Sequence, residues 1–336
     1  MTVLPTRRLG SLTVSAIGLG CMNLSHAYGV PPSADDGARL LNHALDQGVT
    51  LLDTAALYGG GRNETLIGRA VMHRRQEFTL ASKCVLDLRE GQRILDGSPA
   101  AITASLDASL ARLGTDHIDL YYMHRLDRNV PIEDSIGALA LAVEAGKIRA
   151  IGLSEMSAAT IARAHAVHPI AAVQSEYSAV VRNPDVAVLE TCERLGIGFV
   201  AFSPIARGLL ARGIHDDDYV EGDVRRAMPR FRAPLLGHNL QAIARFDALA
   251  DEAGVTSAQL AIAWVLSRGS TVVPIPGTRS IAHLDEDLAA ATLTLDADVF
   301  ARVDALFEGD AIRGPRYGAA MQAQIDTELL PDEELA

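Results

Sequence analysis

The chain has 336 residues, of which 49% are hydrophobic and 21% are charged, and its formal net charge is −12. This length and apolar content allow a large buried core, whereas the acidic surface disfavours nucleic acid and anionic membranes as partners, because both attract clustered lysine and arginine. Three widely spaced cysteines, Cys21, Cys84 and Cys192, match neither a metal site nor a disulfide framework. No apolar run approaches the roughly 18 residues of a membrane span, so we expect a cytoplasmic protein.

The first predicted elements are a hairpin, a strand and a helix. Residues 7–15 are typical of a small polar hairpin that turns at 9–12, and a first strand is predicted at 16–20. Ser33 has the position of a helix cap before a segment with one apolar face, and Gly48 is a typical helix stop. The first helix is therefore predicted between these two residues.

Strand and helix patterns then alternate along the chain. Further strands are predicted at 50–54, 78–83, 118–124, 148–154, 171–177, 198–204 and 272–277. Helices are predicted near 63–73, 99–113, 132–145, 157–167, 185–195, 257–268 and 280–291. Eight strands with interposed helices and no linker predict an α/β fold, a (β/α)8 TIM barrel that forms one domain over residues 1–336. A doubly wound sheet is the alternative, but the turn at 18–23 lacks the third glycine of a dinucleotide-binding motif.

The interval after the seventh strand is much longer than the others. It contains a polar loop at 205–239, an extra amphipathic helix at 240–253 and the expected helix from Ser257. Loops of this length in compact domains are usually functional lids or disordered segments. The loop carries an aromatic residue among four arginines, which favours a lid over a ligand; the arginines are Arg225, Arg226, Arg230 and Arg232.

Ionisable side chains end three of the predicted strands. Asp53, Lys83 and His124 have these positions, and Tyr58 follows Asp53 at the start of a glycine-rich turn. Each has an ordinary alternative role, as a helix cap, a surface residue, a core histidine or an interface aromatic. The C-terminal ends of barrel strands converge on one face, however, so all four side chains are predicted at the same mouth.

Together these four side chains fit proton donation to a carbonyl group. Asp53 would keep Lys83 charged, and a buried lysine cation beside a phenol lowers the pKa of the tyrosine. Tyr58 would then act as a general acid near neutral pH, while His124 positions the carbonyl oxygen. Because no side chain supplies a hydride, reduction of the carbonyl also requires a cofactor.

These residues resemble those of the aldo-keto reductase family, and the likeness extends over nearly the whole chain. The matching segments are Asp53-Thr54-Ala55-Ala56-Leu57-Tyr58-Gly59 with Asn63-Glu64, Ser82-Lys83, Asp119-Leu120-Tyr121-Tyr122-Met123-His124, Gly152-Leu153-Ser154, Gln174-Ser175-Glu176-Tyr177, Phe202-Ser203-Pro204 with Arg207-Gly208, and Ile275-Pro276-Gly277-Thr278. Pro229-Arg230-Phe231 and Asp326-Thr327-Glu328 make the chain similar to the bacterial and plant branch that reduces varied aldehydes and ketones.

The resemblance implies a catalytic tetrad of Asp53, Tyr58, Lys83 and His124, with NADPH extended across the barrel mouth. It places Tyr177 under the nicotinamide, Ser154 and Gln174 at the carboxamide, and Thr278 with Arg279 at the 2′-phosphate. Arg207 and Arg279 would supply the local positive charge for this anionic cofactor. The full set implied for the cofactor is Gly20, Cys21, Met22, Asp53, Ser154, Gln174, Tyr177, Ser203, Pro204, Ile205, Arg207, Gly208, Leu210, Pro276, Gly277, Thr278, Arg279, Glu286 and Asp287.

Two positions depart from the family pattern. Glu155 follows Ser154 where the family usually has asparagine, and a carboxylate cannot donate to the carboxamide oxygen. The role of Glu155 therefore stays open between a cofactor ligand and a side chain that turns away. Asp287 follows Glu286 where the family has a second asparagine, so this position can accept a hydrogen bond from adenine but has lost a donor.

The expected function is NADPH-dependent reduction of aldehydes or ketones to alcohols, with hydride transferred from C4 of the nicotinamide and the proton from Tyr58. One alternative is an NADPH-bound regulatory subunit that acts through a protein partner. Another is a phosphate-binding barrel lyase or isomerase, which leaves Tyr58 and Lys83 unexplained. No basic cluster beyond the cofactor site is evident in the sequence, which favours a neutral or aromatic small-molecule carbonyl substrate. Monomer and homo-oligomer are both compatible with the sequence. The candidate substrate-pocket residues are Met22, Tyr28, Leu57, Leu88, Arg125 and Phe231.

Overall fold

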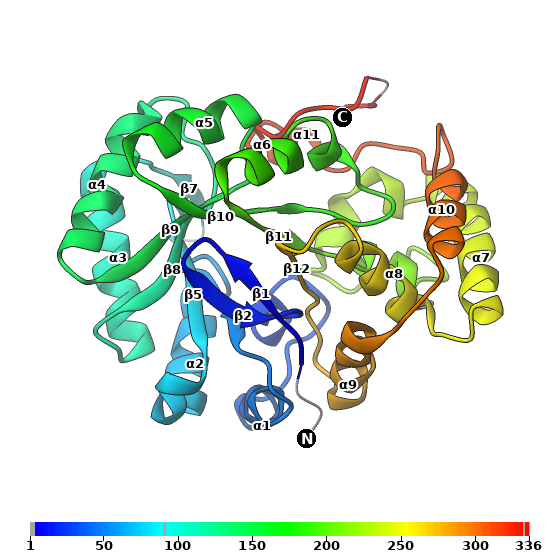
Figure 1. Cartoon of the computed structure of the whole chain (residues 1–336), viewed down its shortest axis with the longest axis horizontal. Coiled ribbons are helices and arrows are strands. Elements are labelled where there is room, and N and C mark those ends of the chain that lie inside the picture. Colours follow the sequence, from blue (N-terminus) through cyan, green and yellow to red (C-terminus); the bar gives the residue numbers. More distant parts are fainter. Residues whose placement is uncertain (1–3, 90–91, 332, 336) are drawn as a thin grey trace.

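Eight parallel strands form a ring at the centre of the molecule (Figure 1). The computed structural model describes residues 4–89, 92–331 and 333–335. In their order around the ring, the strands are β3 (Leu19–Gly20), β4 (Leu51–Asp53), β5 (Thr79–Cys84), β8 (Ile118–Met123), β9 (Ile148–Ser154), β10 (Ile170–Glu176), β11 (Gly198–Phe202) and β12 (Val272–Ile275). Backbone hydrogen bonds of 3.0 Å from Gly18 N to Pro274 O and from Gly20 N to Pro276 O join the first strand to the last. The predicted (β/α)8 barrel is confirmed.

The two faces of the strands are both buried, as expected for parallel strands covered by helices. Side chains two residues apart point to the same face, and one set fills the inside of the ring. Gly152 shows how tightly this interior is packed, because a Cβ atom there would lie 2.3 Å from the Tyr122 ring of the neighbouring strand. The interior set is Leu51, Ala81, Leu120, Tyr122, Ala150, Ala172, Val200, Val273 and Ile275.

The predicted N-terminal hairpin is also confirmed, and it closes one end of the barrel. It consists of β1 (Thr6–Leu9) and β2 (Leu12–Ser15), which pair antiparallel. Leu9 and Val14 of the hairpin are fully buried and belong to the interior cluster of the barrel. Because the hairpin covers the N-terminal ends of the strands, ligands have access from the opposite mouth.

In the described part of the chain, eight helices surround the ring in the predicted places (Figure 1). Side chains of Ser33, Ser98, Ser157 and Ser280 accept hydrogen bonds from the first turns of four of them, and Thr256 forms a capping box with Gln259 at a fifth. The helices are α1 (Ala34–Asp46), α2 (Arg62–Val71), α3 (Pro99–Leu113), α4 (Ile132–Glu144), α5 (Ala158–Val167), α6 (Val188–Leu195), α8 (Ser257–Leu266) and α9 (Ile281–Ala289). Within the described ranges, no helix has both the length and the apolar character needed to cross a lipid bilayer.

Several elements lie outside this regular pattern. The extra helix in the long interval, α7 (Leu235–Glu252), begins five residues before the predicted start, because Leu236 and Asn239 are buried at its beginning. The hairpin of β6 (Leu86–Arg89) and β7 (Gln92–Leu95) was not predicted from the sequence, nor were α10 (Ala297–Leu306) and α11 (Ala319–Gln322). The short 3-10 helices are η1 (Cys21–Leu24), η2 (Met72–Glu77), η3 (Asn183–Asp185), η4 (Ala206–Ala211), η5 (Val224–Ala227), η6 (Pro229–Phe231) and η7 (Ala290–Thr292).

Candidate active site

The four residues of the predicted tetrad lie together at the open mouth of the barrel. Asp53 ends β4, Lys83 lies in β5 and His124 follows β8, while Tyr58 belongs to the turn after β4. The residues two positions before Asp53, Lys83 and His124 all belong to the barrel interior, so the strand alternation turns these side chains inward. Asp53, Tyr58 and His124 line one end of a cavity of about 740 Å³, and Lys83 lies buried behind them; this volume is within the range typical of small-molecule sites.

A buried chain of polar contacts connects three of these residues. Lys83 Nζ lies 2.5 Å from Asp53 Oδ1, 2.9 Å from Thr54 O and 3.3 Å from Tyr58 Oη. Gln174 Nε2 donates to the other oxygen of Asp53 at 2.8 Å. Lys83 is fully buried, and Asp53 is 2% exposed. A charge pair this deeply buried is stable only because both groups have several hydrogen-bond partners.

Burial changes one electrostatic expectation from the sequence. Desolvation lowers the pKa of Lys83, but Asp53 and Tyr58 outweigh it, so the pKa is raised and the lysine stays charged. Desolvation also raises the pKa of Tyr58 above its ordinary value, and the opposing effect of Lys83 does not reverse this. The predicted net lowering of the Tyr58 pKa is therefore wrong. The phenol therefore keeps its proton at neutral pH. Lys83 stabilises the phenolate, so the pKa of Tyr58 is lower than burial alone would make it.

His124 completes the cluster as a neutral imidazole. Its ring lies 5.9 Å from that of Tyr58, at an interplanar angle of 82°. Burial, followed by the charges of Arg125, Lys83 and Arg93, holds the pKa of His124 well below its ordinary value. In the described part of the chain, its buried Nδ1 has no hydrogen-bond partner. A neutral imidazole in this position can donate one hydrogen bond into the cavity through Nε2.

Two residues of helix α2 fix the turn that carries Tyr58. Asn63 is fully buried, accepts from Thr54 Oγ1 at 2.6 Å and donates to Cys21 O at 2.8 Å. The adjacent Glu64 accepts from Ser82 Oγ at 2.6 Å, beside Lys83 in β5. The sequence motif contained both residues without revealing a role, because each acts by joining segments that are distant in the sequence. Three consecutive glycines with positive φ, Gly59, Gly60 and Gly61, connect Tyr58 to the helix.

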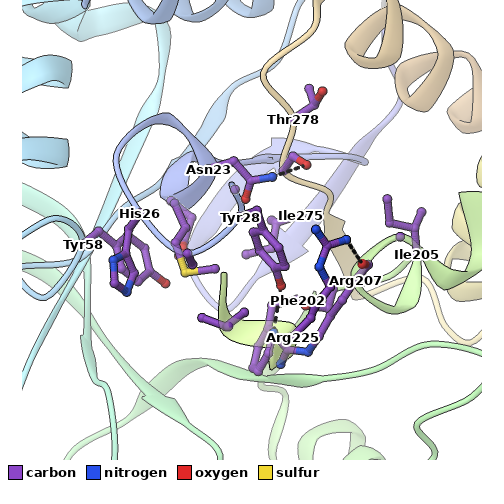
Figure 2. A pocket seen from close by; sticks show the side chains of 18 of the residues that line it. Asn23, His26, Tyr28, Tyr58, Phe202, Ile205, Arg207, Arg225, Ile275 and Thr278 are labelled. Atoms are coloured by element: carbon purple, nitrogen blue, oxygen red, sulfur yellow. Dashed lines mark hydrogen bonds between the residues drawn. The ribbon is translucent and has the colours of Figure 1, made fainter. Parts of the chain in front are cut away.

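The cavity continues from the tetrad across the mouth of the barrel (Figure 2). Tyr58 and His26 lie at one end, and Ile205 and Thr278 lie toward the other. Most residues predicted to contact the cofactor line this cavity. They are Gly20, Met22, Asp53, Ser154, Gln174, Ser203, Pro204, Ile205, Arg207, Gly208, Gly277, Thr278 and Arg279.

Tyr177 does not face the cavity, and its predicted place under the nicotinamide is wrong. Its ring is fully buried against Phe199 and Trp264, and its hydroxyl donates to Asp185 at 2.6 Å. Gln174 points into the barrel, so the two-residue period turns Tyr177 to the outer side. Phe202 of β11 is the aromatic residue that lines the cavity at this level.

Five other predicted cofactor contacts also lie outside the cavity lining. Cys21, Leu210 and Pro276 are buried outside the lining, and the side chains of Cys21 and Leu210 pack into the hydrophobic core. Glu286 and Asp287 lie one turn further along α9 than His283, which does line the cavity. The side chains of these five residues therefore do not line the cavity, contrary to the prediction.

Arg207 has a different role from the one the sequence implied. Its guanidinium forms a bidentate contact with Glu176, with 3.1 Å from Nε and 2.9 Å from Nη2. It also donates to the hydroxyls of Tyr28 at 2.8 Å and Tyr317 at 3.0 Å. Because Glu176 neutralises this charge, Arg207 does not supply a free cation for a phosphate. Its hydrogen bonds instead join three segments around the cavity, those that carry Glu176, Tyr28 and Tyr317.

Glu155 turns away from the cavity, which resolves the alternative that the sequence left open. The side chain is fully buried and accepts from Glu176 N at 2.7 Å and from Thr327 Oγ1 at 2.9 Å. Arg316 Nη2 lies 3.3 Å from its second oxygen. Glu155 therefore anchors the C-terminal segment to the strand ends and is not available as a nicotinamide ligand.

The long loop after β11 crosses the cavity and contacts the loop after β3. Val224 N donates to Ala27 O at 2.9 Å, and Gly29 N donates to Asp223 Oδ2 at 3.1 Å. The Arg225 guanidinium lies 5.4 Å from the centre of the Tyr28 ring, and both residues line the cavity (Figure 2). Of the four loop arginines, Arg225 alone is among the described lining residues.

The far end of the cavity has the features that a dinucleotide phosphate requires. Arg279 and Thr278 line it beside Ser280, which caps the N-terminus of α9, where the helix dipole favours an anion. Arg279 has no carboxylate partner among the described residues. Backbone strain is also concentrated here, because Ser203, Ala206 and Arg207 have φ between 49° and 58° although none of them is glycine, a pattern typical of ligand sites. The residues present therefore fit an extended anionic cofactor.

Asp287 leads to a prediction about stability and pH. Burial, together with the charge of Glu286, raises the pKa of Asp287 to about 8 in the fold, whereas an unfolded aspartate has a pKa near ~3.9. The folded state thus binds this proton more tightly than the unfolded state. The stability that the bound proton contributes is lost as the pH rises toward 8. We expect Asp287→Asn to raise the unfolding free energy by at least about 1 kcal/mol at pH 9, with a smaller gain at pH 5.

Thermal or urea unfolding of both proteins at the two pH values measures this difference. Asp298→Asn serves as the control, because this carboxylate is exposed in α10 and should change stability little at either pH. An Asp287→Asn gain that does not grow with pH would contradict the prediction.

Comparison with known proteins is consistent with this geometry. The Aldo/keto reductase family model matches residues 16–308. The "Aldo-keto reductase yakc [NADP(+)]" of Schizosaccharomyces pombe is 40% identical, over 98% of this chain and 99% of its own length. The glycerol dehydrogenase AKR11B4 from Gluconobacter oxydans has a similar structure, with a TM-score of 0.82, 26% identity and 98% coverage of both chains. The aldo-keto reductase AKR11C1 from Bacillus halodurans, in its holo form, has a TM-score of 0.75 at 27% identity, covering 90% of this chain and 96% of its own.

Proposed function

This chain belongs to the aldo/keto reductase family of NADP-dependent oxidoreductases, and from that premise we propose that it reduces aldehydes and ketones to alcohols with Tyr58 as the general acid. The observation that carries this proposal is the buried contact chain from Tyr58 Oη through Lys83 Nζ to Asp53. A tyrosine with no catalytic role would not need a buried cation 3.3 Å from its hydroxyl.

The cavity offers separate groups for the two ends of the cofactor. Thr278 and Arg279 would hold the 2′-phosphate beside the N-terminus of α9. Ser154 and Gln174 would hold the carboxamide, and Phe202, in place of Tyr177, presents an aromatic surface to the cavity. When bound, NADPH supplies the hydride from C4 of its nicotinamide.

The side chains of the tetrad donate the proton and stabilise the charge that develops during the reaction. Tyr58 remains protonated at neutral pH, so its hydroxyl can deliver a proton to the carbonyl oxygen. Lys83, held charged by Asp53, stabilises the phenolate that this transfer leaves behind. Neutral His124 donates a hydrogen bond to the same carbonyl oxygen, which orients it and stabilises the partial negative charge of the transition state.

A steady-state assay with purified protein tests this function. We expect loss of NADPH absorbance when aromatic and aliphatic aldehydes are added, with turnover between about 1 and 10³ s⁻¹. Product analysis should show the corresponding alcohol in equal amount to the NADPH consumed. Tight NADPH binding without turnover of any aldehyde or ketone in the panel would contradict the proposal and favour the regulatory subunit.

A further inference from the structure

The catalytic end of the cavity carries two arginines that the tetrad does not use. Arg125 directly follows His124 and is 6% exposed, whereas Arg93 lies in β7 of the unpredicted hairpin and is exposed at the rim. Both line the cavity that Tyr58 and His124 also line. Sequence reasoning missed Arg93 because nothing in the sequence indicated that the segment after β5 folds back over the mouth.

Arginines in this cavity differ in whether a carboxylate neutralises them. Arg207 is paired with Glu176 at 2.9 Å, and Arg225 is paired with Asp223 at 2.7 Å. Over the described residues, no ion pair is found for the three remaining arginines of the lining. These are Arg93, Arg125 and Arg279. Arg279 lies at the predicted 2′-phosphate end, which leaves two uncompensated cations beside the tetrad.

The hydrogen bonds of Arg125 hold it in place without neutralising it. Its Nη1 donates to His124 O at 2.5 Å and to Ser154 Oγ at 3.2 Å, and both acceptors are uncharged. The nearest carboxylate in the sequence, Asp127, accepts from Gly97 N at 2.9 Å and from Asn129 N at 3.0 Å. The guanidinium is therefore fixed at the cavity wall, with no carboxylate partner among the described residues.

The two arginines also affect each other and the tetrad. Partial desolvation, and then the like charge of Arg125, lower the pKa of Arg93 to about 10. Arg125 and Arg93 likewise contribute, after burial, to the low pKa of His124. Among the described side chains around Tyr58, Lys83 and Asp53 cancel each other and Tyr58 and His124 are neutral, so Arg93 and Arg125 leave a net positive charge. Two like charges held close together are stabilised when an anion binds between or beside them.

From this arrangement, and on the basis of the proposed function, we infer that the preferred substrate carries an anionic group, in the simplest case a carboxylate, that Arg93 and Arg125 bind while the carbonyl lies against Tyr58. The sequence had favoured neutral carbonyl substrates, because it showed no basic cluster outside the cofactor site. The other candidate pocket residues divide into Met22, Tyr28 and Leu57, which line the cavity, and Leu88 and Phe231, which do not.

A matched pair of substrates tests this inference in the holoenzyme. 4-Carboxybenzaldehyde and its methyl ester present the same aldehyde on the same ring and differ by one charge and one methyl group. We expect the wild-type protein to prefer the acid in kcat/KM, and Arg93→Gln to reduce the acid-to-ester ratio by about 10-fold to 100-fold, the effect of losing a charge-assisted hydrogen bond. Arg93→Lys should recover part of the ratio, and Arg226→Gln, which removes an exposed arginine outside the cavity lining, should leave it unchanged.

An equilibrium binding experiment tests this inference independently of the proposed reaction. Titration of the NADP⁺-loaded protein with benzoate and with benzamide measures the preference for a carboxylate without any turnover. Tighter binding of benzoate that is lost in Arg93→Gln supports the anion site even if no aldehyde is reduced, in which case the reductase proposal alone fails. Equal binding of the two probes, a preference that survives Arg93→Gln, or an Arg93→Gln effect confined to the NADPH dissociation constant would overturn the inference.

Discussion

Tyr58→Phe is expected to reduce kcat for aldehyde reduction by about 10²- to 10⁴-fold, the contribution typical of a positioned general acid. The substitution removes only the hydroxyl, so the ring keeps its edge contact with His124 at 5.9 Å and the cavity keeps its shape. The dissociation constant for NADPH should change by less than a factor of about three, because no cofactor contact depends on this hydroxyl. Single-turnover kinetics and fluorescence titration measure the two quantities.

Tyr121→Phe is the matched control for this substitution. Tyr121 lies in the same barrel, but its side chain belongs to the packing between strands and helices, and its hydroxyl makes a 3.4 Å contact with Ser105. Losing that hydroxyl should leave kcat close to the wild-type value. Retention of more than about a tenth of kcat in Tyr58→Phe would mean that another group donates the proton.

Lys83→Met is expected to lower the free energy of unfolding by about 3–5 kcal/mol, because it leaves the Asp53 carboxylate buried without its cation. The ammonium group also contacts Thr54 O at 2.9 Å and Tyr58 Oη at 3.3 Å, so the same change removes the charge that stabilises the phenolate. Catalysis should therefore fall together with stability. Urea unfolding and kcat measurements on the folded fraction separate the two effects.

The double variant Asp53→Asn/Lys83→Met tests the electrostatic origin of this loss. Removing both charges should restore most of the stability but none of the activity, because a buried pair is costly mainly when one partner is left alone. Lys147→Met provides the control, since Lys147 pairs with Asp107 at 2.6 Å on the surface, with side-chain exposures of 40% and 54%. That substitution should change stability by less than about 1 kcal/mol. A double variant as unstable as Lys83→Met would show that lost packing, and not the unpaired charge, dominates.

The residues around β10 show why some parts of the site were assigned wrongly from the sequence. Gln174 and Tyr177 belong to the same motif, yet Gln174 contacts Asp53 in the site whereas Tyr177 packs against Trp264 outside the barrel. The two-residue period of the strand contained this information, because an odd spacing places side chains on opposite faces. The same period places Phe202 on the inner face, two residues after the interior Val200 of β11. A strict application of the period to each strand would have excluded Tyr177 from the site and selected Phe202.

The charge state of the site was harder to predict from the sequence than its position at the barrel mouth. Arg207 reads as a phosphate ligand, but it lies against Glu176, which is 31 residues distant in the chain. Arg93 was not identified from the sequence, and the hairpin of β6 and β7 brings it to the cavity. Whether a charge is free or neutralised depends on which segments meet, and local patterns do not encode such distant contacts.

The sequence by itself determined the barrel and the positions of Asp53, Lys83 and His124 at its mouth. Both follow from local rules, since apolar runs alternate with amphipathic helices and the C-terminal ends of parallel strands must share one face. Only the tertiary structure decided that burial raises the pKa of Tyr58, that Glu155 anchors the C-terminal segment, and that Arg93 and Arg125 have no ion-pair partner among the described residues. These properties depend on desolvation and on pairing between distant segments, and both arise only when the whole chain has packed.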